Sequence, residues 1–180
     1  PRALPSWRNL KDKKGLLDSV SSAFKVGEDV AKKNNILEFD LGLFVQGRLN
    51  AEKGGFVVAD IEKEKLCMID SCWGDANLIA MGEEAFDTMW VDENGKIIEK
   101  IIRTKDHGYF YDGIERKRIE MKREKQITQT LTDEEAVRIS AHVFRAARKY
   151  NCNVEAEFMI TKEGLTEKIV EPEKMMEFFV

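Results

Sequence analysis

The chain has 180 residues, of which 43% are hydrophobic and 34% charged, and its formal net charge is −4. This length predicts one domain with room for two small lobes, and the composition is typical of a globular chain. The negative charge argues against a nucleic-acid-binding protein. No apolar run approaches the ~20 residues that cross a bilayer, which argues against a membrane protein.

The chain carries three cysteines, Cys67, Cys72 and Cys152, and no C-x-x-C pair. An odd and sparse set of this kind predicts reduced, buried thiols rather than disulfides or a zinc site. The first residues contain no apolar segment like that of a secretory signal. We therefore expect a cytoplasmic protein.

The first elements are predicted in order along the chain. Residues 1–15 are polar and lysine-rich, so we expect an irregular lead-in. Residues 16–33 are predicted to form a helix, because Leu16, Val20, Phe24 and Ala31 share one face and lysines gather at its end. Strands are predicted at residues 41–49, 55–60, 65–71, 87–92 and 96–102, with a short helical turn at residues 77–81.

Turn residues and charge define the middle of the chain. Glu93-Asn94-Gly95 is a strong hairpin signal. Two weaker strands are predicted at residues 109–111 and 114–121. The second of these contains the basic cluster Arg116-Lys117-Arg118, which glutamates interrupt, so we expect a solvated face there. His107 and His142 are expected to be structural or solvated rather than catalytic.

The last elements have the clearest signals. Thr132-Asp133-Glu134-Glu135 is a capping box, which predicts a helix over residues 133–150. Residues 153–172 read as two strands joined at Thr161-Lys162-Glu163-Gly164, because apolar and polar side chains alternate before the turn. A short tail is expected at residues 175–180. The order of elements predicts an α+β fold with a largely antiparallel sheet and two main helices packed on it.

The final hairpin carries two glutamates, Glu157 before the turn and Glu171 near its end. If they approach one another across the hairpin, they suit Mg²⁺, which takes one or two protein carboxylates together with phosphates. The same pattern also fits two glutamates on a solvated sheet face.

A collinear series of short motifs runs through most of the chain. The series resembles the nucleotide-binding domain of phosphoenolpyruvate synthase and pyruvate phosphate dikinase, an ATP-grasp fold, over residues 16–172. Its members are Phe44-Val45-Gln46-Gly47-Arg48-Leu49, Gly54-Gly55-Phe56-Val57-Val58, Trp73-Gly74-Asp75-Ala76-Asn77, Phe86-Asp87-Thr88-Met89-Trp90-Val91-Asp92, Gly95-Lys96-Ile97-Ile98-Glu99-Lys100, Leu131-Thr132-Asp133-Glu134-Glu135 and the hairpin from Glu155 to Glu171.

The resemblance implies a single ATP-grasp-like half domain over residues 16–174. It implies ATP or a related nucleotide as ligand and Mg²⁺ with ATP as cofactor, with Glu157 and Glu171 as metal ligands. The backbone of Gln46, Gly47 and Arg48 would meet the adenine. Lys105 matches a family lysine but receives no role.

The departures from the family pattern concern the phosphate-gripping groups. The Gly-Leu-Gly-Glu element has become Gly74-Asp75-Ala76-Asn77 and has lost its glutamate, and the arginine after Glu171 is replaced by Glu173. Residues 1–15 offer no counterpart of the family's N-terminal lobe, so we expect a partner protein or domain to supply it. The alternatives are a non-catalytic relative that acts as an interaction or regulatory protein, and an unrelated α+β enzyme. The last is disfavoured because no nucleophile–base set is visible.

Overall fold

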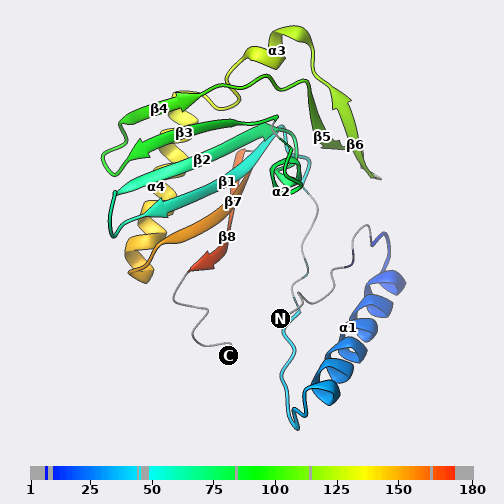
Figure 1. Ribbon diagram of the computed structural model, residues 1–180. Coiled ribbons are helices and arrows are strands. Elements are labelled where there is room, and N and C mark those ends of the chain that lie inside the picture. Colours follow the sequence, from blue (N-terminus) through cyan, green and yellow to red (C-terminus); the bar gives the residue numbers. More distant parts are fainter. Residues whose placement is uncertain are drawn as a thin grey trace. The chain divides into compact units, whose positions relative to one another are not determined.

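The computed structural model describes residues 7, 10–43, 45, 49–83, 85–113, 115–162 and 164–172, and for residues 166–172 it describes the backbone alone. The chain divides into two parts, Pro1–Arg48 and Leu49–Val180 (Figure 1). Each part is described by itself.

The first part consists of helix α1, Lys13–Lys33, and the segment that follows it. The Asp12 carboxylate accepts the backbone N–H of Gly15 at 2.7 Å, so the predicted helix begins at Lys13, before residue 16. Gly27 allows close packing, since a Cβ there would lie 2.9 Å from the ring of Phe39. The strand predicted at residues 41–49 is wrong at residues 41–43, 45 and 49, which belong to no strand, and the rest of that stretch lies outside the described residues.

The second part is built on a six-stranded antiparallel sheet, ordered β4-β3-β2-β1-β7-β8 (Figure 1). This confirms the predicted α+β class with a largely antiparallel sheet. The six strands are β1, Lys53–Asp60; β2, Leu66–Trp73; β3, Asp87–Asp92; β4, Ile97–Ile101; β7, Val154–Thr161; and β8, Gly164–Pro172.

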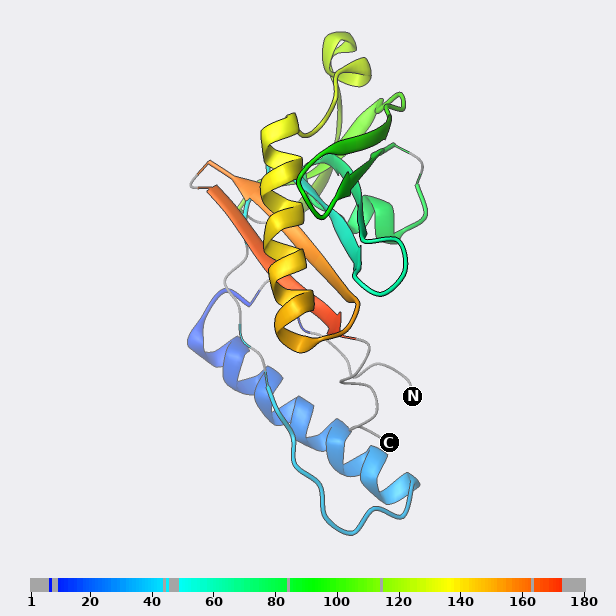
Figure 2. The same cartoon turned by 90° about the vertical axis from the view of Figure 1, so that its left-hand side faces the viewer.

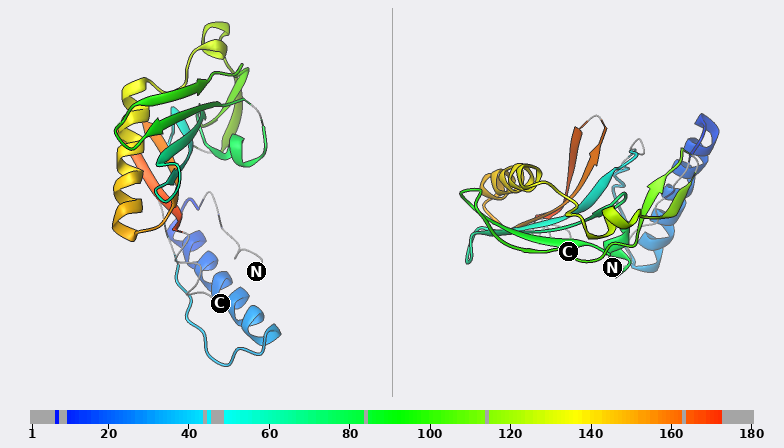
Figure 3. Two further views of the ribbon diagram at one scale, coloured as in Figure 1. Left: turned by 60° about the vertical axis from the view of Figure 1, so that its left-hand side comes forward. Right: turned by 90° about the horizontal axis from the view of Figure 1, so that it is seen from above.

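A two-stranded antiparallel ribbon and three helices complete this part. The ribbon pairs β5, His107–Tyr111, with β6, Arg116–Glu120. The helices are α2, Asn77–Ala80; α3, Arg123–Ile127; and α4, Asp133–Tyr150. The sequence did not predict α3. Figure 3 shows the ribbon and α3 beyond the end of the sheet, away from the centre of α4.

Helix α4 lies across one face of the sheet (Figure 2). Its predicted capping box is confirmed: Thr132 Oγ1 accepts the N–H of Glu135, and the Glu135 carboxylate accepts the N–H of Thr132. Its apolar stripe meets alternate residues of four strands, because successive side chains of a strand point to opposite faces. The buried core that results contains Val57, Ile69, Met89, Val91, Ile139, Val143, Phe144, Ala156 and Phe158.

The three cysteines are free and buried, as predicted. Burial raises the pKa of the Cys67 thiol to about 12 and also raises that of Cys72, so neither is a reactive thiolate at neutral pH. Among the helices of the described residues, none combines the length and apolar character that crossing a bilayer requires.

Candidate functional site

The face of the sheet opposite α4, which we call the second face, carries the polar side chains of interest. Strand alternation puts position 56 of β1, position 70 of β2, position 88 of β3 and positions 155 and 157 of β7 on it. The apolar side chains beside them are half-exposed or exposed: Phe56, Val58, Met68 and Trp90.

One row of residues crosses the second face from strand to strand. Cα register pairs Glu157 with Phe56, Phe56 with Asp70, and Asp70 with Thr88. The row therefore begins at a carboxylate on β7, passes an aromatic ring and reaches a second carboxylate on β2. The Glu157 side chain is half-buried and already interacts with other groups of the protein.

The predicted metal ligands lie on the paired strands β7 and β8. The register pairs Glu171 with Glu155, and Glu157 with Lys168, with an irregularity after Glu155. Glu171 therefore lies opposite Glu155, which is two residues from Glu157 along β7. The side chain of Glu171 is outside the described residues, as are Gln46, Gly47 and Arg48 altogether, so the predictions for these residues stay predictions.

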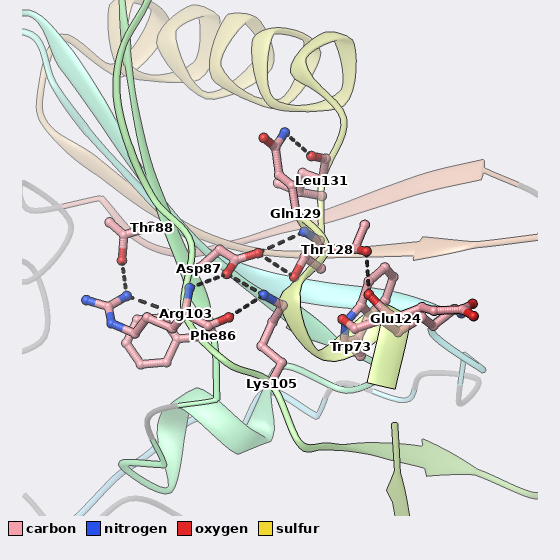
Figure 4. Close-up of polar contacts among 12 residues, drawn as sticks. Trp73, Phe86, Asp87, Thr88, Arg103, Lys105, Glu124, Thr128, Gln129 and Leu131 are labelled. Atoms are coloured by element: carbon pink, nitrogen blue, oxygen red, sulfur yellow. Dashed lines mark hydrogen bonds and ion pairs between the residues drawn. The ribbon is translucent and has the colours of Figure 1, made fainter. Parts of the chain in front are cut away.

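Asp70 is the polar residue of the second face that the sequence analysis missed. Thr88 Oγ1 donates to Asp70 Oδ1 at 2.7 Å, and Arg103 Nη1 donates to Thr88 Oγ1 at 2.9 Å. Arg103 is held further by the carbonyl of Phe86 at 3.2 Å and lies over the Phe86 ring, 4.8 Å from its centre (Figure 4). Desolvation by burial raises the pKa of Asp70, and the Thr88 hydrogen bond and the Arg103 charge oppose this in part.

One end of the second face is covered by the chain that follows β2. Cys72, Leu78 and Ala85 form a small buried cluster there, against which Phe86 packs. Gly74 makes this turn possible: its φ is +80°, and a Cβ would lie 2.0 Å from the carbonyl oxygen of Tyr109. The second face is therefore bounded beside Arg103 and Phe86.

The departure from the family's Gly-Leu-Gly-Glu element lies in this covered end. Asp75 Oδ1 accepts the backbone N–H of Asn77 at 2.9 Å and also the Asn77 side-chain amide. The Asp75 carboxylate thus fixes the turn before α2. This local pairing gives the altered motif a structural role.

Lys105, which the resemblance left without a role, is fully buried on the α4 side of the sheet. Its Nζ donates to Asp87 Oδ1 at 2.6 Å and to the Arg103 carbonyl at 2.7 Å. Asp87 is also fully buried, and its Oδ2 accepts the N–H and the hydroxyl of Thr130 (Figure 4). This pair joins β3 to the segment that leads into α4.

His107 lies on the ribbon and is 6% exposed. Its Nε2 is 2.5 Å from Glu83 Oε2 and its Nδ1 is 2.5 Å from Asp106 Oδ1. The hydrogen bond to His107 lowers the pKa of Asp106. Tyr109 also donates to Glu83, at 3.0 Å. These contacts tie β5 to the segment after α2, in keeping with the structural role predicted for His107.

The second face carries the wrong charge to grip a triphosphate by itself. Its described positions on β1, β2, β3 and β7 include five carboxylates and neither lysine nor arginine: Asp60, Asp70, Asp92, Glu155 and Glu157. Lys53 and Lys100 point to the other side, where they pair with Glu135 and Asp133 of α4. A phosphate bound on these four strands therefore requires a cation from another segment. Arg103, which reaches Thr88 from the segment after β4, is a described cation near this face.

No group of three or more His, Cys, Asp or Glu side chains within the described part of the chain is arranged to hold a metal ion by itself. The donor set nevertheless fits Mg²⁺ bound with phosphates, which needs only one or two protein carboxylates. Glu155 and Glu157 stand on one face of β7, and the backbone of Glu171 is paired with that of Glu155.

Comparison with known proteins gives one family. The model of the AMP/ATP-binding domain of pyruvate phosphate dikinase matches residues 31–170. No curated protein matches the chain. The matched segment covers more than half of the chain and includes the whole six-stranded sheet except the end of β8.

Proposed function

Because the chain belongs to the family of the AMP/ATP-binding domain of pyruvate phosphate dikinase, we propose that it binds ATP with Mg²⁺ on the second face of its sheet. Glu157 and Glu171 would hold the metal, and the backbone of Gln46, Gly47 and Arg48 would meet the adenine. Magnesium, when bound, neutralises the charge on the phosphates of the nucleotide.

The observation that carries this proposal is the place of Glu157. It lies on the face opposite α4, in register with Phe56, and its neighbour Glu155 faces the same way. A magnesium ion held there meets hard oxygen ligands, which it prefers. The aromatic ring beside it offers apolar surface to the organic part of a nucleotide.

A partner protein or domain would supply the cations that grip the phosphates. Phosphoryl transfer depends on positioning and on charge neutralisation by cations and metal. The second-face positions on β1, β2, β3 and β7 contain no lysine or arginine, which supports this division of labour. We therefore propose that any phosphotransferase chemistry takes place only together with that partner.

Thermal unfolding with ATP, Mg²⁺ and both together tests the proposal. At 100 times the dissociation constant, a ligand stabilises the folded protein by about 2.7 kcal/mol, which corresponds to roughly 5–11 °C for a chain of this length. Glu157→Gln should remove the part of this shift that requires Mg²⁺. Glu99→Gln, which removes an exposed carboxylate from edge strand β4, is the matched control and should leave the shift unchanged.

A melting temperature that does not respond to ATP with Mg²⁺ would reject the nucleotide site. The second candidate, a non-catalytic relative that acts as an interaction or regulatory protein, would then be preferred. One observation already favours it: the altered Gly-Leu-Gly-Glu element has its Asp75 carboxylate engaged in a local turn with Asn77.

A further inference from the structure

Asp70 has one carboxylate oxygen fixed and one available. Oδ1 accepts the Thr88 hydroxyl, which in turn accepts from Arg103. Within the described part of the chain, Oδ2 has no hydrogen-bond partner although the side chain is half-buried. Because Thr88 fixes Oδ1 and is itself held by Arg103, the other carboxylate oxygen is oriented before any ligand binds.

Asp70 lies in the same row as Glu157. Two strand spacings of about 4.8 Å separate them, so their backbones are about 10 Å apart across β1. This is too far for the two carboxylates to share one Mg²⁺, whose ligands lie about 2.0–2.1 Å away. A phosphate is also an unsuitable neighbour for Asp70, since the two carry like charges.

The separation matches another part of a nucleotide. In an extended nucleoside triphosphate, the ribose hydroxyls lie about as far from a metal on the terminal phosphates as Asp70 lies from Glu157. Phe56 lies between the two carboxylates and offers apolar surface to the sugar. Hydroxyl groups donate hydrogen bonds, which a half-buried carboxylate needs in place of the water it has lost.

We propose that Asp70 is a sugar-recognition residue, whose free carboxylate oxygen accepts a hydrogen bond from a ribose hydroxyl of the bound nucleotide. This inference rests on the proposed function. It adds to it a residue on β2 and a preference for ribonucleotides. Thr88 and Arg103 act as positioning residues: Thr88 donates to the Asp70 carboxylate, and Arg103 donates to the Thr88 hydroxyl.

The test measures the affinity of the full chain for ATP, 2′-deoxy-ATP and 3′-deoxy-ATP, each with Mg²⁺, by calorimetry. Wild-type protein should bind at least one deoxy analogue about tenfold or more weakly than ATP, since hydrogen bonds to charged groups are strong. Asp70→Asn, which keeps the acceptor for Thr88, should bind ATP and that analogue within about threefold of one another. Glu99→Gln should discriminate as the wild type does. Asp70→Ala is the second variant, which removes both oxygens.

The outcomes separate this inference from the function on which it rests. Equal wild-type affinity for ATP and both analogues would overturn the sugar contact and leave the nucleotide site intact. Discrimination that survives in Asp70→Asn and Asp70→Ala would also overturn it, as would its loss in Glu99→Gln. Inosine triphosphate, which changes the base and keeps the ribose, is measured as a fourth ligand. If Asp70→Asn changes the discrimination against inosine triphosphate and not that against a deoxy analogue, Asp70 contacts the base and the inference is wrong. No binding of ATP by the wild type would remove both proposals.

Discussion

Replacing Lys105 by methionine should destabilise the fold strongly, because it leaves a buried carboxylate without its cation. Lys105 and Asp87 are both fully buried, and their charged atoms are 2.6 Å apart. Removing one partner of a buried ion pair typically costs about 3–5 kcal/mol. The losses of stability in the two single variants, Lys105→Met and Asp87→Leu, should lie at different ends of this range.

The hydrogen bonds of the pair decide which variant costs more. In Lys105→Met, Asp87 keeps three donors: the N–H of Arg103 at 3.0 Å and the N–H and hydroxyl of Thr130. We therefore expect the lower value, about 3 kcal/mol, or roughly 6–12 °C in melting temperature. In Asp87→Leu, Lys105 keeps the Arg103 carbonyl alone among its partners in the described residues. Three donors lose their acceptor, so the cost should reach about 5 kcal/mol.

Urea unfolding followed by circular dichroism measures both costs. Lys100→Met is the matched control, because Lys100 also joins the β4 region to the start of α4, through Asp133, but both side chains are solvent-exposed. Such surface pairs are worth about 0–1 kcal/mol. The double variant Lys105→Met/Asp87→Leu should cost less than the sum of the single variants. If Lys105→Met and Lys100→Met agree within about 0.5 kcal/mol, the reasoning on the buried pair is wrong.

Two further predictions concern the sheet. Gly55→Ala should lower the free energy of unfolding by about 1–3 kcal/mol or more. The added Cβ would lie 2.0 Å from the Asp70 carbonyl oxygen and 2.6 Å from the Phe158 ring. Gly42→Ala, whose added Cβ meets no atom of the described residues within 4 Å, is its control in urea unfolding, and equal losses of stability would contradict the packing argument. Asp70→Asn should gain stability relative to the wild type as pH rises from 4 to 7. Burial raises the pKa of Asp70 above its ordinary value of 3.8, so the folded state holds that proton more tightly and ionisation costs stability that asparagine does not lose. If the difference in unfolding free energy between Asp70→Asn and the wild type does not change with pH, this prediction is wrong.

Much of the fold could be predicted from local chemistry. Glu93-Asn94-Gly95 forms the expected hairpin turn, in which Gly95 has a φ of +82°. The alternation along β7 predicted the buried positions Val154, Ala156 and Phe158, because a strand with one covered face has period 2. It fails at the end of the strand, where Ile160 is half-buried and Thr161 is buried. Helix α4 begins where its capping box indicated. Each of these signals lies within a few residues.

Other features depend on distant residues and could not be predicted. Lys105 stands in a charged stretch that reads as exposed, and its partner Asp87 is 18 residues away until β3 and β4 fold back on one another. Helix α3 has no buried residue, so its sequence has no apolar stripe to reveal it. Asp70 interrupts an apolar strand, and alternation alone predicts that such a position is solvated. The Thr88 hydroxyl that contacts Asp70 is held by Arg103, which belongs to a segment beyond β4.

Arg103 connects the buried pair with the proposed sugar site. Asp87 accepts the Arg103 N–H, and Lys105 donates to the Arg103 carbonyl, so the backbone of this residue is held on both sides. Its side chain reaches Thr88 on the second face, while Lys105 turns to the opposite face. Two cations of one short segment are thus divided between the two faces of the sheet. The buried pair stabilises the core and, through the Arg103 backbone, also fixes the group that orients Asp70.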